Sequence, residues 1–119
     1  MKPKLKEMYS LQLSQPLDEF WPEDESNFAI PIRLMIGPED SLGSESFDIL
    51  VCTPDWIKSQ YIEEKCVWGH HMLIVMEYDF SLIQQKIERY LIGCTGEDWQ
   101  AVARKLRIMG SWEFEDYQS

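Results

Sequence analysis

The chain is poor in the residues that build metal and redox sites. It has two histidines and three cysteines among 119 residues, and no two cysteines have the CxxC spacing of a metal or redox site. The histidines, His70 and His71, are neighbours, so on a strand they would point to opposite faces and would not share a metal ion. We therefore expect no bound metal and no cofactor.

The odd number of cysteines leaves at least one thiol without an intrachain partner. Cys52 and Cys94 stand in strongly apolar patterns and are expected to be inert core residues, which leaves Cys66 as the one candidate for a reactive thiol. We expect no disulfide, which is typical of a protein in a reducing compartment.

Long apolar runs are also missing. Lys2, Lys4 and Lys6 interrupt the start of the chain, and no stretch reaches the roughly 20 apolar residues of a membrane span. Together with the cysteine count, this predicts a cytoplasmic protein.

Basic residues are few. There are 11 Lys and Arg against 21 Asp and Glu, a formal net charge of −10. Such a chain lacks the cations that neutralise phosphates, which argues against nucleic acid and against an anionic membrane as partners. It predicts attraction to basic proteins.

Apolar residues are plentiful and follow regular patterns. Hydrophobic residues make up 45% and aromatic residues 13% of the chain, enough for one core in a single domain over residues 1–119. Alternating or continuous apolar segments predict strands at 4–14, 28–36, 47–53 and 71–77, and three- and four-residue apolar spacing predicts helices at 54–62, 80–94 and 97–109. This order indicates an α+β fold: a largely antiparallel sheet of about four strands, with the two C-terminal helices packed on one face. The helical residues expected to face the sheet are Ile83, Ile87, Leu91, Trp99, Val102 and Leu106.

Local signals support several of these boundaries. Thr53 and Asp79 each precede a predicted helix and suit its N-cap. Thr95 and Asp98 have the spacing of a capping box, which predicts the start of the last helix just after Thr95. Pro31 lacks an N–H, so its strand should be at an edge or contain a bulge there.

The last stretch, Trp112–Tyr117, alternates aromatic and acidic residues. We expect Trp112 and Phe114 to be buried against the sheet or the last helix, because both offer a large apolar surface. The acids between and after them should remain in water and face a basic partner.

Two tryptophans fall in predicted loops and are candidate binding anchors, since tryptophan is enriched at interface hot spots. For each tryptophan the equally weighted alternative is a buried side chain that holds its loop in place, and for each acidic cluster the alternative is a solvated surface without a partner. The candidate partner-binding residues are Trp21, Glu23, Asp24, Glu25, Trp68, Glu113, Glu115 and Asp116.

Three stretches over about residues 47–117 resemble the bacterial immunity protein 8 family of polymorphic-toxin systems. They are Ile49–Trp56 (ILVCTPDW), Gly69–Val75 (GHHMLIV) with the helix of Tyr78–Leu91, and Trp99 with Leu106–Gly110 and the closing Trp112–Tyr117 (WEFEDY). The order and spacing of the three carry the resemblance. It implies a small cytosolic binder, encoded beside a toxin, that neutralises this toxin in the producing cell and its kin; it assigns no functional residues.

The function expected from both arguments is stoichiometric binding of a cognate toxin, without catalysis, and the toxin expected is a basic effector such as a nuclease. The alternative is a small hydrolase or transferase that uses an acidic cleft, and a structural subunit of a larger assembly comes third. An enzyme needs a concave pocket with convergent polar groups, whereas a binder presents acids and aromatic anchors on a flat or convex surface.

Overall fold

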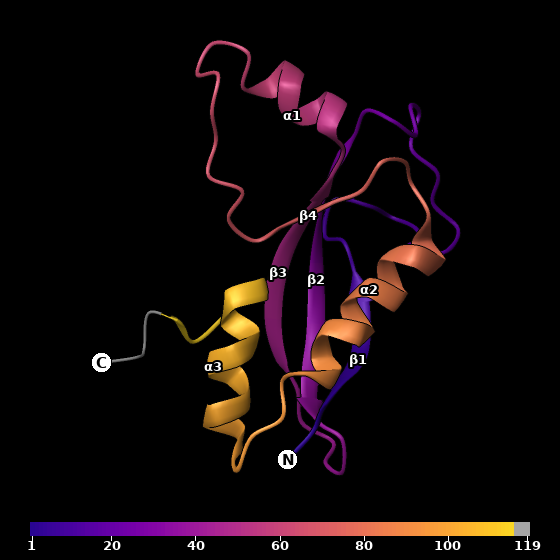
Figure 1. The fold of residues 1–119 in the computed structure, drawn as a ribbon. Coiled ribbons are helices and arrows are strands. Elements are labelled where there is room, and N and C mark those ends of the chain that lie inside the picture. Colours follow the sequence, from indigo (N-terminus) through magenta and orange to yellow (C-terminus); the bar gives the residue numbers. More distant parts are fainter. Residues whose placement is uncertain (116–119) are drawn as a thin grey trace.

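The computed structural model describes residues 1–115 and has an α+β fold built on a mixed sheet (Figure 1). The strands are β1 (Pro3–Tyr9), β2 (Ala29–Pro38), β3 (Glu45–Cys52), β4 (Met72–Ile74) and β5 (Ser111–Trp112), and the helices are α1 (Pro54–Gln60), α2 (Phe80–Ile92) and α3 (Trp99–Met109). The strand order is β1-β2-β3-β4, and β5 pairs with the other end of β3.

Three of the strand pairings are antiparallel, as predicted, but β3 and β4 run parallel. The chain leaves β3 through α1 and returns along residues 61–71 before β4 begins, so β4 starts beside Leu50 and runs in the same direction as β3. This connection fixes the direction of β4, which the apolar pattern alone did not reveal.

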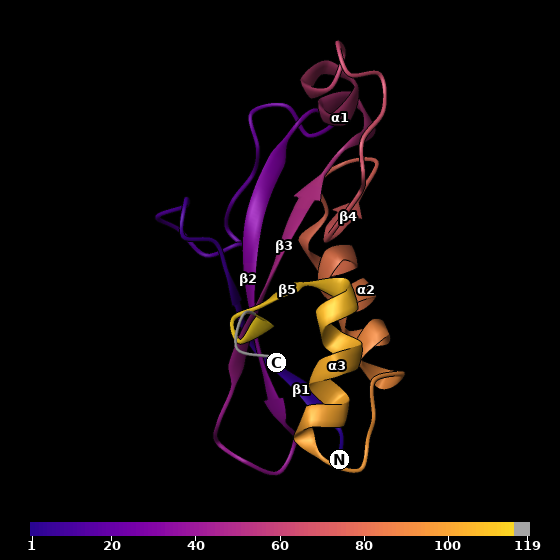
Figure 2. The same cartoon turned by 90° about the vertical axis from the view of Figure 1, so that its left-hand side faces the viewer.

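The sheet and the two C-terminal helices form two layers, seen edge-on in Figure 2. Alternate side chains of β2 and β3 point toward the helices, and Ile32, Leu34 and Phe47 are almost fully buried there. The predicted helix face is confirmed: Ile83, Ile87, Leu91, Val102 and Leu106 are buried, and Trp99 is half-buried.

The helix starts follow the capping signals with one exception. Thr53 and Asp79 cap α1 and α2 as expected. The last helix, however, is capped by Asp98, whose carboxylate accepts the N–H of Ala101 at 2.8 Å. The prediction that Thr95 begins this helix was wrong, because an aspartate immediately before the apolar face is the nearer acceptor for the first free N–H groups.

The strand boundaries differ more from the predictions. The first strand ends at Tyr9 instead of 14, and the fourth covers three residues instead of seven. The expectation for Pro31 holds only locally: β2 is an inner strand, but β1 ends opposite Arg33, so β2 has no neighbour on that side at Pro31. On the other side Leu50, opposite Pro31, donates its N–H away from β2, to the carbonyl oxygen of His71 (2.9 Å).

The histidine pair also differs from the prediction. His71 has a positive φ of 56° and precedes the strand, so it turns back onto His70 and the ring centroids lie 3.7 Å apart. The prediction that the two histidine rings point to opposite faces of a strand was therefore wrong. One ring nitrogen of His71 donates to the carbonyl oxygen of Arg107 (2.9 Å) and ties this turn to the end of α3.

The C-terminal aromatic segment is anchored by a shared carboxylate. Trp112 is buried and stacks on Phe47, with ring centroids 6.2 Å apart and planes 6° from parallel. One oxygen of Glu45 accepts the indole N–H of both Trp112 (2.9 Å) and Trp99 (2.8 Å). Phe114 is half-buried, edge-on to Trp112.

We expect Trp112→Ala to lower the free energy of unfolding by about 3–5 kcal/mol, because it removes a buried ring and leaves a cavity beside Phe47. Phe114→Ala should cost less than half as much, since its side chain is only half-buried. Urea denaturation of the two variants measures both losses. Equal losses would contradict this description of the segment.

Candidate partner-binding site

The strongest concentration of acid in the structure is the segment of residues 17–28, which we call the acidic loop. It contains no Lys or Arg and leads into β2. Its acids are Asp18, Glu19, Glu23, Asp24 and Glu25, and all five are exposed. In Figure 1 this loop lies to the right, beside the beginning of α2.

Tyr78 holds the acidic loop through its ring. The ring is buried and meets Phe20, Trp21 and Phe28 edge-to-face at centroid distances of 5.6, 5.6 and 5.5 Å. Such pairs add attraction beyond the area they bury. Trp21 nevertheless remains 62% exposed, so it is held at one edge and offers the rest of its surface to solvent.

Tyr78 also bonds to both ends of the acidic stretch. Its hydroxyl donates to the carbonyl oxygen of Leu17 (2.7 Å), and its backbone N–H donates to the carbonyl oxygen of Glu25 (2.9 Å). Burial, and then the charge of Asp18, raise the pKa of the Tyr78 hydroxyl. The loop is therefore fixed at several points and is not a free acidic tail.

Residues next to Tyr78 extend the acidic surface. Glu77 and Asp79 are exposed on either side of it, and a carboxylate oxygen of Asp79 caps α2 by accepting the N–H of Leu82 (3.1 Å). Within the loop, Asp24 accepts the N–H and the hydroxyl of Ser26, both at 3.0 Å. These hydrogen bonds hold the carboxylates of Asp79 and Asp24 in defined positions.

The predicted C-terminal acids lie elsewhere and have partners. Glu113 accepts the backbone N–H of Ser46 (2.6 Å), and Glu115 forms an exposed ion pair with Arg107 (3.3 Å). Asp116 lies outside the described residues. The segment that carries Glu113 and Glu115 is on the opposite side of Figure 1 from the acidic loop, so the structure does not bring the two acidic groups together.

Trp68 is separate from both. It is 92% exposed and stands in the segment that follows α1, at the left of Figure 1. The structure thus places the predicted partner-binding residues in three regions, of which the acidic loop alone combines several free carboxylates with a supported tryptophan.

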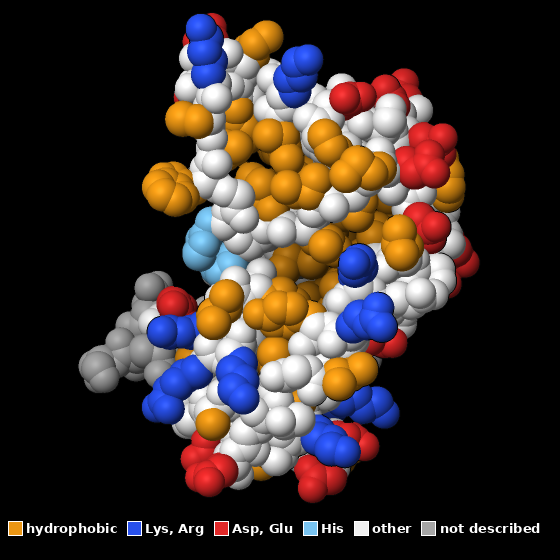
Figure 3. Space-filling view, in the orientation of Figure 1, with side chains coloured by type: hydrophobic (Ala, Val, Ile, Leu, Met, Phe, Trp, Pro, Cys, Tyr) orange, Lys and Arg blue, Asp and Glu red, His pale blue; other side chains and the backbone are white. Residues whose placement is uncertain are grey.

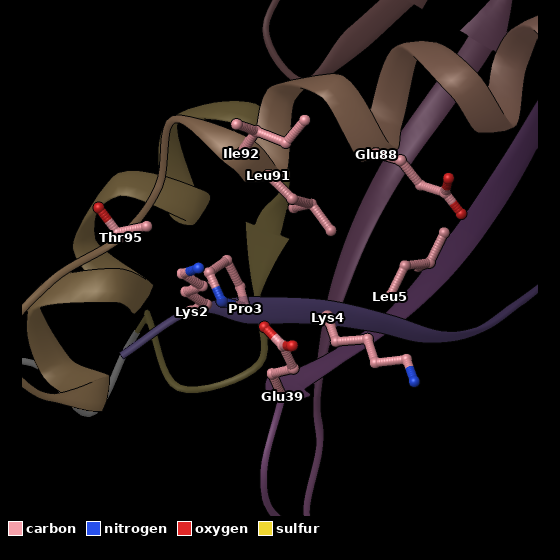
Figure 4. Close-up of a pocket in the computed structure, with 9 residues that line it drawn as sticks. All are labelled: Lys2, Pro3, Lys4, Leu5, Glu39, Glu88, Leu91, Ile92 and Thr95. Atoms are coloured by element: carbon pink, nitrogen blue, oxygen red, sulfur yellow. The ribbon is translucent and has the colours of Figure 1, made fainter.

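One pocket, of about 430 Å³, lies between β1 and the end of α2. Figure 4 shows that its two carboxylates lie apart: Glu39 points toward the start of β1, Glu88 extends from α2 at the other end of the view, and Lys4 points away from the centre. This is not the arrangement of acid–base catalysis, which requires charged groups within reach of one substrate atom. In the part of the chain that the structure describes, no group of three or more metal-ligating side chains is present.

Comparison with known families matches the model of immunity protein 8 over residues 4–117. The chain belongs to the immunity protein 8 family. Membership implies a toxin as the partner in general and suggests a protein that is not an enzyme. Neither a comparison with curated proteins nor one with solved structures gave a match. Over residues 1–115, no helix has the length and apolar character needed to cross a bilayer.

Two residues central to this geometry were not singled out from the sequence. Tyr78 and Ile83 flank the N-cap Asp79 at the positions of a hydrophobic staple, a signal that would have drawn attention to Tyr78. Glu45 gives no such signal, because the two tryptophans that it binds are 54 and 67 residues away along the chain.

Tyr78→Phe should lower the free energy of unfolding by about 1–2 kcal/mol near neutral pH, because the carbonyl of Leu17 loses its buried donor. The raised pKa of Tyr78 means that the folded state holds this proton more tightly than the unfolded state. The resulting stability is present below about pH 10, the ordinary pKa of tyrosine, and is lost as the pH rises further. Denaturation at pH 7 and at alkaline pH should thus show the wild-type advantage shrinking. A constant advantage would contradict the assignment.

Proposed function

We propose that this immunity protein neutralises its cognate toxin by stoichiometric contact through the acidic loop and that the toxin is a basic effector, such as a nuclease. Family membership supplies the toxin as partner, and the net charge of −10 favours a basic one. The proposed reaction is binding alone, with no substrate turned over. Its place is the cytoplasm, where free thiols such as the exposed Cys66 persist.

The observation that carries this proposal is the state of Trp21. Trp21 is 62% exposed while Tyr78 supports its ring at a fixed position, so it presents a large apolar surface that a partner can cover without first ordering it. Glu23 and Glu25 are exposed close by in the chain. An aromatic anchor surrounded by charge is the usual composition of a binding hot spot and its rim.

The C-terminal acids contribute less in this proposal. Glu115 is already paired with Arg107, and Glu113 is committed to the backbone of β3. A basic toxin would have to compete with these contacts, whereas Glu23 and Glu25 are open to it.

We expect Glu23→Lys/Glu25→Lys to slow association with the purified toxin about tenfold at low salt, because local charge steers encounter. The matched control is Glu39→Lys/Asp40→Lys, which changes the net charge equally in the turn after β2. The control should slow association only about twofold, through the overall charge. Stopped-flow kinetics across a salt series measures both, and the difference should fade near 1 M salt, where the Debye length is about 3 Å.

Equal association rates and equal salt slopes for the two double variants would show that the toxin does not approach the acidic loop. Absence of any binding by the wild type would overturn the proposed function itself.

A further inference from the structure

The segment of residues 54–71, which we call the arm, is rich in apolar residues and buries none of them. It comprises α1 and the loop that returns to β4, and none of its side chains is buried. Its large apolar residues are Trp56, Ile57, Tyr61, Ile62, Val67 and Trp68. Ile62 is 67% and Trp68 92% exposed. An apolar surface of this kind, outside the core, is typical of a site that another molecule covers.

The arm is fixed at both ends, so its open apolar surface is not a frayed terminus. At its start, the hydroxyl oxygen of Thr53 accepts the N–H of Trp56 (3.4 Å). At its end, the carbonyl oxygen of His71 accepts the N–H of Leu50 (2.9 Å). The ring of His71 donates to the carbonyl oxygen of Arg107 (2.9 Å). The arm therefore stands in a defined position relative to the sheet and to α3.

Two pockets open on the same face of the molecule as α2 and α3. One of about 300 Å³ lies within the arm, between α1 and the returning loop, and includes Ile57, Ile62 and Val67. The other, of about 330 Å³, lies between the base of the arm and the two C-terminal helices, and includes Tyr90 and Ile108. Figure 3 shows apolar side chains gathered in the depression between α1 and these helices. We call the two pockets together the hollow.

The charge of the hollow is opposite to that of the whole chain. Lys58 and Lys65 line the pocket in the arm and Lys86 lines the other, and neither lining includes a carboxylate. The acids of the arm, Asp55, Glu63 and Glu64, are exposed outside these linings. Three lysines thus line an apolar surface in a protein whose net charge is −10. The complementary occupant carries apolar side chains together with carboxylates.

We propose that the hollow binds an apolar, carboxylate-bearing segment of the toxin, in addition to the contact at the acidic loop; this rests on the proposed function. A second copy of the chain is the less favourable occupant, because two molecules of charge −10 repel each other. A toxin that meets an acidic surface at one place and a basic, apolar one at another is fixed in one orientation. The hollow thus supplies specificity and slow dissociation, and the acidic loop supplies rapid encounter.

The test is the dissociation rate from the purified product of the neighbouring toxin gene, measured by surface plasmon resonance. Ile62→Ser/Val67→Ser should weaken affinity roughly 30-fold or more, chiefly through faster dissociation. The matched control is Leu42→Ser/Ile92→Ser, two aliphatic residues that are 103% and 78% exposed outside the hollow. The control should change affinity less than about threefold. Neither pair is buried, so thermal denaturation should show both variants folded.

A charge-reversal pair tests the chemistry of the occupant. Lys58→Glu/Lys65→Glu should dissociate about tenfold faster than wild type, because like charges then face the carboxylates of the bound segment. Lys2→Glu/Lys4→Glu makes the chain equally more acidic but lies at the pocket beside β1, so its dissociation rate should equal that of wild type.

The outcomes separate the two proposals. If the wild type does not bind the toxin, the proposed function is overturned, and this inference with it. If the wild type binds and the hollow variants dissociate as slowly as their controls, the inference alone is overturned. Sedimentation that shows a wild-type dimer broken by Ile62→Ser/Val67→Ser would make the hollow a self-interface and also overturn it.

Discussion

The buried hydrogen bonds of Thr53 join the parts of the molecule on which both proposed binding surfaces depend. Thr53 is fully buried, and its hydroxyl oxygen accepts the backbone N–H of Phe28 (3.2 Å) and of Trp56 (3.4 Å). Phe28 ends the acidic loop and Trp56 lies in the first turn of the arm, so one side chain positions both segments relative to β3. A second bond, from the N–H of Thr53 to the carbonyl oxygen of Phe28 (3.2 Å), makes this junction reciprocal. Removing this acceptor would leave the buried N–H of Phe28 unsatisfied, so the junction is costly to break.

The distribution of charge follows from this architecture. Five carboxylates lie in the loop that precedes β2, and the lysines of the hollow come from the arm and from α2. The net charge of −10 describes the long-range field that a toxin meets first, whereas the local charges decide which parts of it fit. Tight binding between an immunity protein and its toxin needs both the long-range field and the matched local charges. Steering by the field raises the association rate, and matched local contacts lower the dissociation rate.

The sequence predicted what local chemistry determines. The apolar spacing of α2 and α3 and the caps at Thr53 and Asp79 depend on residues within one or two turns of each other, and the structure confirms them. The direction of β4 and the shared carboxylate of Glu45 depend on contacts between distant segments, which a single sequence does not encode visibly. For the candidate site, the sequence supplied Trp21, Trp68 and the acids. It did not identify Tyr78, which supports the ring of Trp21, or the partners that Glu113 and Glu115 have inside the chain.

The central claim is that toxin covers the acidic loop and the arm together. Hydrogen–deuterium exchange of the protein alone and with a saturating amount of purified toxin tests it most directly, because amide protection reports where a partner lies and which segments stop opening. The account predicts added protection in residues 17–28 and 54–71, and unchanged exchange in the turn at residues 39–44, which lies far from both at the lower end of Figure 1. Protection confined to residues 39–44, or to the open face of the sheet, would contradict it.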